Sequence, residues 1–288
     1  FVSRRNNLER MGASDNDAST PPIAATQQDT GDIFSFITPT EFVDLPSQGL
    51  QYPENHPLYK TSTIEIRHMT AKEEDILTSE SLIKKGIALD RLVQSVLVDK
   101  SIKPHDLLIG DKNAVLIAAR ITGFGPQYHT SLTCPVCATT NETTLDLSDI
   151  QAKELPDFPE NVTTTEKGNY VITLPDYNNL EIEVRLLTGH DEKAIMGKRE
   201  KRRKLKLPDT NITDQLTAII ARVNDITEPN LLAQFAEQVP TRISREIRNL
   251  YETLVPDLDM TFGFECDNCS HVGKVDMPIT ADFFWPDA

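Results

Sequence analysis

The 288-residue sequence lacks the motifs of common catalytic sites and of membrane proteins. No apolar run approaches the roughly eighteen residues that suggest a transmembrane helix, so we expect no membrane span. The six histidines form no H-E-x-x-H ligand pair, and neither a phosphate-binding glycine loop nor a G-x-S-x-G motif is present. No group of acidic residues has a spacing that calls for acid–base chemistry. We therefore predict that the protein is not an enzyme.

Positive charge is scarce relative to negative charge. Lysine and arginine number 29 and aspartate and glutamate 44, which gives a net charge of −15. This balance argues against a protein that coats nucleic acid, and it favours solubility and basic protein partners. Apolar residues make up 39% of the chain, enough to build the core of one large or two medium domains.

Cysteine is also rare, and all four cysteines fall in two C-x-x-C turns. Cys134 and Cys137 lie near the middle of the chain, and Cys266 and Cys269 lie near its end. Two residues between ligands let a tight turn direct both sulfurs at one cation, and a second turn completes the tetrahedron that zinc prefers. Strand-like sequence flanks each turn. The spacing therefore predicts a zinc ribbon, with one structural zinc bound by the four thiolates.

The distance between the two turns is unusual. More than a hundred residues separate Cys137 from Cys266, whereas an ordinary ribbon has a couple of dozen. The site therefore closes a large insertion, and we expect Cys266→Ser to loosen that whole insertion.

Other states of the cysteines stay open. A redox C-x-x-C needs a nucleophilic cysteine at a helix N-terminus, but turn-forming residues follow both pairs here. Disulfides need an oxidising compartment, and no signal peptide is visible. Reduced cysteines without metal are the third alternative. A catalytic zinc is disfavoured, because four sulfurs leave no coordination position for water or substrate.

Composition and pattern predict an α+β fold in four parts. The parts are a terminal arm (1–32), a proline-rich strap with a helical domain (33–127), a zinc ribbon formed by the two C-x-x-C turns, or knuckles (128–150 and 257–288), and an α+β insertion between the knuckles (151–256). The terminal arm is polar and lacks periodicity, so it is expected to be extended or disordered unless a partner orders it.

Apolar periodicity predicts the elements within these parts. Thr70 with Glu73 has the spacing of a capping box, Asp111 is a plausible N-cap, and Gly123 with Gly125 is a plausible helix stop. Helices are expected over residues 70–78, 89–98, 104–108, 112–123, 191–206, 212–222, 230–238 and 244–254. Strands are expected over residues 63–69, 170–174 and 180–186, and beside each knuckle over 128–133, 143–147, 260–265 and 273–277.

Several motifs outside the knuckles resemble one protein family. They are Leu45-Pro46-Ser47-x-Gly49, Tyr52-Pro53, and the run Met69-Thr70-Ala71-x-Glu73-Glu74-Asp75. Together they resemble the baseplate hub proteins of contractile-tailed, T-even-like bacteriophages, over most of residues 40 to 288. The resemblance implies a helical part before a C-x-x-C knuckle and a closing segment such as Phe283-Phe284-Trp285-Pro286. The terminal arm and the long insertion depart from the family pattern.

The resemblance also implies a function. It predicts a structural or assembly component of a tail baseplate hub, held by zinc and docked on other tail proteins. The expected location is the virion tail baseplate, and the host cytoplasm during assembly. A transient tail-assembly chaperone, absent from the finished particle, is one alternative.

A basic run provides the other alternative. Residues 198–206 contain seven positive residues in nine, which suggests a zinc-ribbon nucleic-acid-binding protein. No aromatic or base-reading side chain is interleaved, however. We therefore expect the run to be a solvated helix end or a dock for an acidic protein surface.

Overall fold

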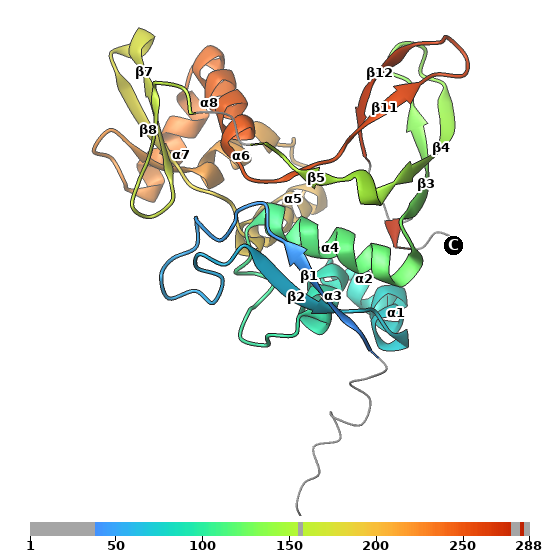
Figure 1. The fold of residues 1–288 in the computed structure, drawn as a ribbon. Coiled ribbons are helices and arrows are strands. Elements are labelled where there is room, and N and C mark those ends of the chain that lie inside the picture. The colour runs from blue at the N-terminus through green and yellow to red at the C-terminus, as the bar shows by residue number, and fades with distance from the viewer. Residues whose placement is uncertain (1–37, 155–157, 278–282, 285–288) are drawn as a thin grey trace, which may run out of the picture. The chain divides into compact units, whose positions relative to one another are not determined.

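The computed structural model describes residues 38–154, 158–277 and 283–284. These residues belong to one compact unit that starts at Thr38. The predicted arm over residues 1–32 and Trp285 lie outside the described residues. Within the described part, eight α-helices accompany small antiparallel sheets, which confirms the predicted mixture of α and β structure (Figure 1).

The N-terminal region is a strand pair with four helices. Strands β1 (Thr40–Asp44) and β2 (Thr63–Arg67) pair in an antiparallel sheet, joined by the proline-rich strap. Gly49 in the strap has φ +72°, and a Cβ there would lie 2.4 Å from the carbonyl oxygen of Leu58, so only glycine fits this turn. The helices are α1 (Ala71–Thr78), α2 (Glu80–Lys84), α3 (Ala88–Val96) and α4 (Ile109–Phe124).

The predicted capping box is confirmed at the start of α1. The Glu73 carboxylate accepts hydrogen bonds from the backbone N–H and the hydroxyl of Thr70, at 3.0 and 2.6 Å. The same buried carboxylate forms an ion pair with Arg67 of β2 at 2.5 Å and accepts from the hydroxyl of Ser95 of α3. One side chain therefore joins three elements of this region.

This carboxylate makes stability depend on pH. Burial opposes ionisation of Glu73, but the hydrogen bonds from Arg67, Ser95 and Thr70 outweigh it and lower its pKa from 4.5 to about 2. A lowered folded-state pKa gives stability that is complete above about pH 4.5 and is lost as pH falls toward about 2. We expect a loss on the order of 3 kcal/mol across that window.

Urea unfolding at several pH values measures this dependence. Glu73→Gln should flatten the acid limb of the stability profile, whereas Glu74→Gln, at the exposed neighbouring position, should leave it unchanged. An acid limb that is equally steep in both variants would rule out Glu73 as its source.

Two local predictions in this region are wrong. Residues 104–108 form turns and not a helix, because their carbonyls bond to the start of α5: the N–H groups of Gly189 and His190 donate to the carbonyls of Leu107 and His105, respectively. The N-cap of α4 is Leu108 and not Asp111, whose carboxylate points instead toward the strap. The predicted helix stop is confirmed, since α4 ends at Phe124 and Gly125 has φ +82°.

The two cysteine turns each join a pair of strands, as predicted. The first hairpin pairs β3 (Gln127–Thr133) with β4 (Thr140–Asp146), and the second pairs β11 (Thr261–Glu265) with β12 (Val272–Asp276). Between them in sequence, short strands β5 (Gln151–Ala152) and β10 (Leu258–Asp259) pair with each other. The chain therefore enters and leaves residues 151–256 at one place.

Residues 151–256 contain a four-stranded antiparallel sheet and four helices. The predicted strand over residues 180–186 ends at Val184, and the predicted helix over residues 212–222 is too long, because its last part pairs with β8 as a strand. The strands are β6 (Val162–Thr164), β7 (Tyr170–Leu174), β8 (Leu180–Val184) and β9 (Ile220–Val223). The helices are α5 (Gly189–Lys204), α6 (Asn211–Ile219), α7 (Pro229–Gln238) and α8 (Thr241–Leu254).

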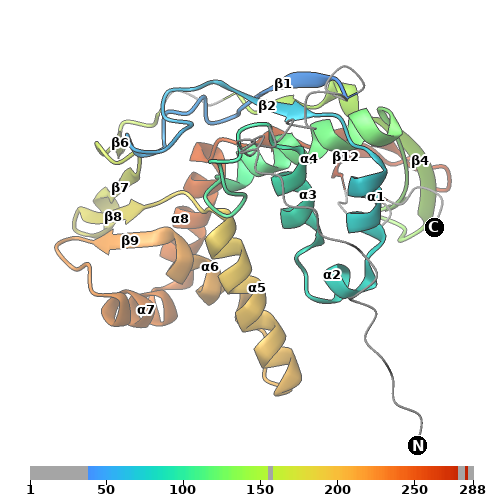
Figure 2. The same ribbon diagram turned by 90° about the horizontal axis from the view of Figure 1, so that it is seen from below.

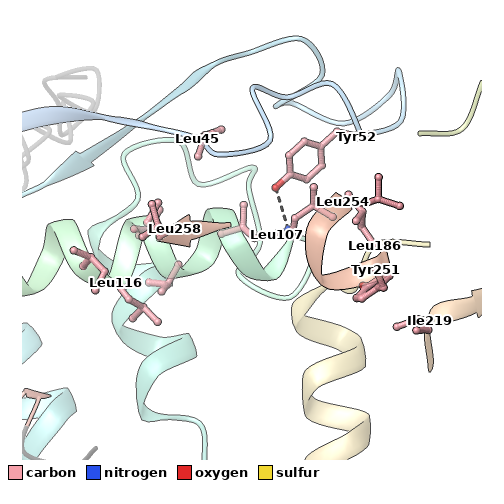
Figure 3. Packing of buried hydrophobic residues seen from close by; sticks show 14 of the residues in the cluster. Leu45, Tyr52, Leu107, Leu116, Leu186, Ile219, Tyr251, Leu254 and Leu258 are labelled. Atoms are coloured by element: carbon pink, nitrogen blue, oxygen red, sulfur yellow. Dashed lines mark hydrogen bonds between the residues drawn. The ribbon is translucent and has the colours of Figure 1, made fainter. Parts of the chain in front are cut away.

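The insertion packs into the same core as the N-terminal region. Figure 3 shows Leu45 and Tyr52 of the strap gathered with Tyr251 and Leu254 of α8 in one buried cluster. The carbonyl of Pro256 approaches α4 so closely that a Cβ on Gly110 would lie 2.2 Å from it. The ammonium group of Lys112 lies 2.7 Å from both Asp90 of α3 and Glu192 of α5. The insertion is therefore held by packing as well as by its two connections.

A buried arginine attaches the C-terminal aromatic residues to α4. Arg120 donates to the carbonyls of Phe283, Gly125 and Gln127 at 2.6, 2.8 and 3.2 Å. The ring of Phe283 packs edge-to-face on Tyr128 at 5.1 Å between centroids. Phe283 and Phe284 are both buried, so these two rings are part of the core. Across the described ranges, no helix is both long and apolar enough to cross a bilayer.

Candidate metal centre

Each cysteine turn has the same backbone geometry. In the first turn, the Cys134 N–H donates to the Thr139 carbonyl, and the Ala138 N–H donates to the Cys134 carbonyl. In the second turn, the Cys266 N–H donates to the His271 carbonyl, and the Ser270 N–H donates to the Cys266 carbonyl. Ala138 and Ser270 occupy equivalent positions with φ near +58° and +55°. The two hairpin loops therefore repeat one conformation, in which both sulfurs of a turn face the same side.

The two turns bring the four sulfur atoms together. All four lie within 4.8 Å of one another. Cys134 Sγ lies 3.7 Å from Cys269 Sγ, and Cys137 Sγ lies 3.6 Å from Cys266 Sγ. Disulfide sulfurs lie about 2.05 Å apart, whereas a tetrahedron with zinc–sulfur bonds of about 2.3 Å has edges of about 3.8 Å. The arrangement fits four thiolate ligands around one zinc ion.

A small core of its own supports this cluster. Leu132 and Phe264, one from each hairpin, are buried with Cys134 and Cys266, and Val275 packs against them. This group is separate from the main core. Few apolar contacts therefore hold the two hairpins together. A metal ion bound by the four sulfurs would link the two hairpins at this point.

Asn141 connects the two turns and was not identified from the sequence. Its side-chain oxygen accepts a hydrogen bond from the Asp267 N–H at 3.0 Å, and its amide nitrogen donates to the Thr139 carbonyl at 3.0 Å and lies 3.7 Å from Cys266 Sγ. Asn141 is 5% exposed. A buried amide four residues after a C-x-x-C pair, with both ends bonded, positions the ligands of both knuckles at once. An amide side chain near the start of the strand that follows the first knuckle was the signal available in the sequence.

The environments of the thiols differ. Hydrogen bonds with the side chain and backbone of Thr139 lower the pKa of Cys137 to about 5. A backbone hydrogen bond at His271 lowers the pKa of Cys269, but burial and the neighbouring cysteines outweigh it and raise that pKa to about 12. The cluster thus favours a thiolate at Cys137, and it opposes the ionisation of a second thiol at Cys269.

Other candidate ligands do not gather. Among the residues that the structure describes, these cysteines form the one group of three or more His, Cys, Asp or Glu side chains whose ligand atoms converge. His105 and His190 lie near the single carboxylates of Asp90 and Asp106, respectively. The basic run over residues 198–206 occupies the end of α5 and the turn after it, far along the chain from both knuckles.

Comparison with known proteins identifies the family. A family model described as T4 bacteriophage base plate protein matches residues 40–285, from the first residue of β1 to the residue after Phe284. No curated protein and no solved structure matched the chain. The family match covers most of the sequence and confirms the resemblance drawn from the strap and the Met-Thr-Ala run. The chain belongs to the T4 bacteriophage base plate protein family.

Proposed function

We propose that this protein is a structural component of a phage tail baseplate hub, in which one zinc ion bound by Cys134, Cys137, Cys266 and Cys269 holds two distant hairpins as a ribbon. The convergence of the four sulfurs carries the proposal. Family membership supports the baseplate role and contact with other tail proteins. The protein would act without catalysis, in the virion tail.

The proposed zinc would have a mechanical role. A tetrahedral four-thiolate site has no open coordination position, so the metal supplies cross-linking and not Lewis-acid chemistry. The chain's own residues orient the thiolates through the knuckle hydrogen bonds and Asn141. A component that must keep its shape while neighbours attach to it benefits from such a cross-link.

The proposed domain division follows from this role. Residues 33–127 provide the strap and helices, residues 128–150 and 257–288 form the ribbon, and residues 151–256 are carried between its two halves. The terminal arm over residues 1–32 would attach to a neighbouring tail protein.

The positioning role of Asn141 gives a testable expectation. Asn141→Ala removes the hydrogen bonds by which this buried amide holds the Asp267 N–H and the Thr139 carbonyl, so we expect zinc affinity to fall by about 10- to 100-fold. Competition with a chromophoric zinc chelator measures the affinity. Glu142→Ala is the matched control, because this exposed side chain occupies the next position of the same strand and should change affinity little. Equal losses in the two variants would show that Asn141 has no special role.

An inventory of purified tail particles by mass spectrometry tests the structural role. The proposal predicts this chain in the finished particle, with a fixed stoichiometry relative to the other baseplate proteins. Its presence in cells that assemble tails but absence from the finished particle would replace the structural role with that of a transient assembly chaperone.

A further inference from the structure

The end of α5 and the segment after it form a feature that neither the core nor the cysteine cluster explains. We call residues 196–212 the basic arm. Gly189 is the only buried residue among the sixteen of α5. Figure 2 shows the C-terminal half of α5 extending away from the elements that surround its first turn. The helix is therefore anchored at its start and free at its end.

Charge is concentrated in this arm. Seven of the 29 basic residues of a chain with net charge −15 lie within residues 198–206. The partners of these basic side chains within the described part of the chain also belong to the arm: Lys204 pairs with Glu200 at 2.7 Å, and Arg202 donates to the Pro208 carbonyl at 2.9 Å. The positive charge is thus uncompensated by the rest of the fold.

The arm also exposes large apolar side chains. Met196, Leu205, Leu207 and Ile212 are 54%, 69%, 48% and 52% exposed, respectively. They lie before, within and after the basic run. A partner that contacts the arm can therefore bury apolar area as well as pair charges.

The sequence of the basic arm contributes little to the stability of its helix. Lys198 and Arg202, and Arg199 and Arg203, are like charges four residues apart and destabilise the helix. Placement of the cations near the helix C-terminus and the Glu200–Lys204 pair offset part of this cost. A helical segment of this length without tertiary packing is marginal in water. Contact with anionic groups would stabilise it.

We propose that the basic arm docks into an acidic groove with an apolar floor on another tail protein. The positive residues at 198, 199, 201, 202, 203 and 204 surround the helix, since successive residues are turned by about 100°. A partner must therefore supply carboxylates on more than one side, which a groove does and a flat surface does not. This inference rests on the proposed baseplate role.

The chemistry of the arm disfavours other polyanions. A membrane-surface helix needs a continuous apolar face, and charges all round α5 interrupt one. A site for single-stranded nucleic acid needs aromatic stacking platforms, and residues 189–212 contain no aromatic ring other than that of His190. The exposed apolar side chains would have little to bury against a phosphate backbone. An acidic protein groove accounts for both kinds of exposed side chain.

Zero-length carbodiimide cross-linking tests the docking directly, because it joins a lysine amine only to a carboxylate in contact with it. Complexes recovered through an affinity tag from cells that assemble tails, and purified tails, are both cross-linked. We expect Lys198, Lys201, Lys204 and Lys206 to link to aspartates and glutamates in at least two segments of one other tail protein. Links confined to this chain, or to a second copy of it, would overturn the proposal.

A charge-reversal variant provides the second arm of the test. Lys198→Glu with Lys201→Glu and Lys204→Glu should reduce recovery of the partner by at least about tenfold. Lys84→Glu with Lys85→Glu and Lys103→Glu makes the same change in net charge at exposed positions elsewhere and should leave recovery unchanged. Equal recovery with both variants would contradict docking by the arm.

Two further measurements separate the alternatives. The first is binding of the purified chain to a short DNA duplex, and the second is its binding to vesicles that contain phosphatidylglycerol. Binding that is lost in the arm variant would assign the arm to nucleic acid or to membrane and overturn the proposal.

The outcomes for the docking and for the structural role can be told apart. If the chain is absent from purified tails but its arm lysines cross-link to carboxylates in the recovered complexes, the structural role fails and the docking stands. If the chain is present and the arm lysines do not cross-link to a partner, the docking alone fails.

Discussion

Removal of zinc is expected to unfold the ends of the two hairpins that carry the cysteines and to leave the main core folded. Structural zinc sites contribute on the order of 10 kcal/mol to folding. The ends that carry the cysteines share a small core built on Leu132 and Phe264, which cannot replace this contribution, whereas Tyr128 and Leu145 at the other end of the first hairpin belong to the main core. Residues 151–256 instead pack into the main core and are tied by the β5–β10 pair. The loss should therefore be local, and not the loosening of the whole insertion that the sequence suggested.

Hydrogen exchange with and without a strong chelator measures this outcome. Amides of residues 132–141 and 264–273 should lose protection, while those of α4 and β7 should keep it. Cys266→Ser should give the same pattern, and Val136→Ala, between two ligands and 67% exposed, should retain zinc and protection. Exchange that accelerates equally throughout residues 151–256 would mean that the metal holds the insertion after all.

Asp111→Ala is expected to be the most destabilising single substitution outside the cysteine cluster. The buried Asp111 carboxylate accepts from the N–H and hydroxyl of Ser47 at 3.0 and 2.6 Å and from the hydroxyl of Tyr52 at 2.8 Å. Tyr52 in turn accepts from the Leu108 N–H at 3.0 Å, the bond drawn in Figure 3. Alanine would leave three buried donors without an acceptor, each costing about 1–3 kcal/mol.

We expect a loss of about 3–5 kcal/mol in the free energy of unfolding, measured by urea titration. Asp99→Ala is the matched control, because Asp99 is exposed and bonds only to the neighbouring Ser101. Tyr52→Phe removes one donor and one acceptor of the same network and should fall between the two. A loss of less than about 1 kcal/mol for Asp111→Ala would show that the strap is not fastened through this carboxylate.

Local sequence was sufficient where neighbouring residues determine the structure. The capping box of Thr70 and Glu73 depends on residues three apart, and each C-x-x-C turn depends on a few backbone bonds, so both were predicted correctly. The convergence of the two turns was predictable because the chain has only four cysteines, and two C-x-x-C pairs commonly bind one tetrahedral zinc ion together.

Partners that are distant in sequence explain the errors. Asp111 has the composition of an N-cap, but its hydrogen-bond donors lie 64 and 59 positions earlier in the chain. Residues 220–223 have apolar periodicity compatible with a helix, yet β8 offers them a paired edge, and tertiary pairing overrides local preference. Arg120 is buried by carbonyls of residues up to 163 positions away, which no local pattern shows.

X-ray absorption at the zinc edge tests the central claim most directly. The measurement would use the full chain purified without added metal, together with elemental analysis of the same sample. We predict one zinc per chain with four sulfur ligands at about 2.3 Å. A chain without zinc, or a zinc shell that contains nitrogen or oxygen in place of a sulfur, would contradict the four-cysteine centre.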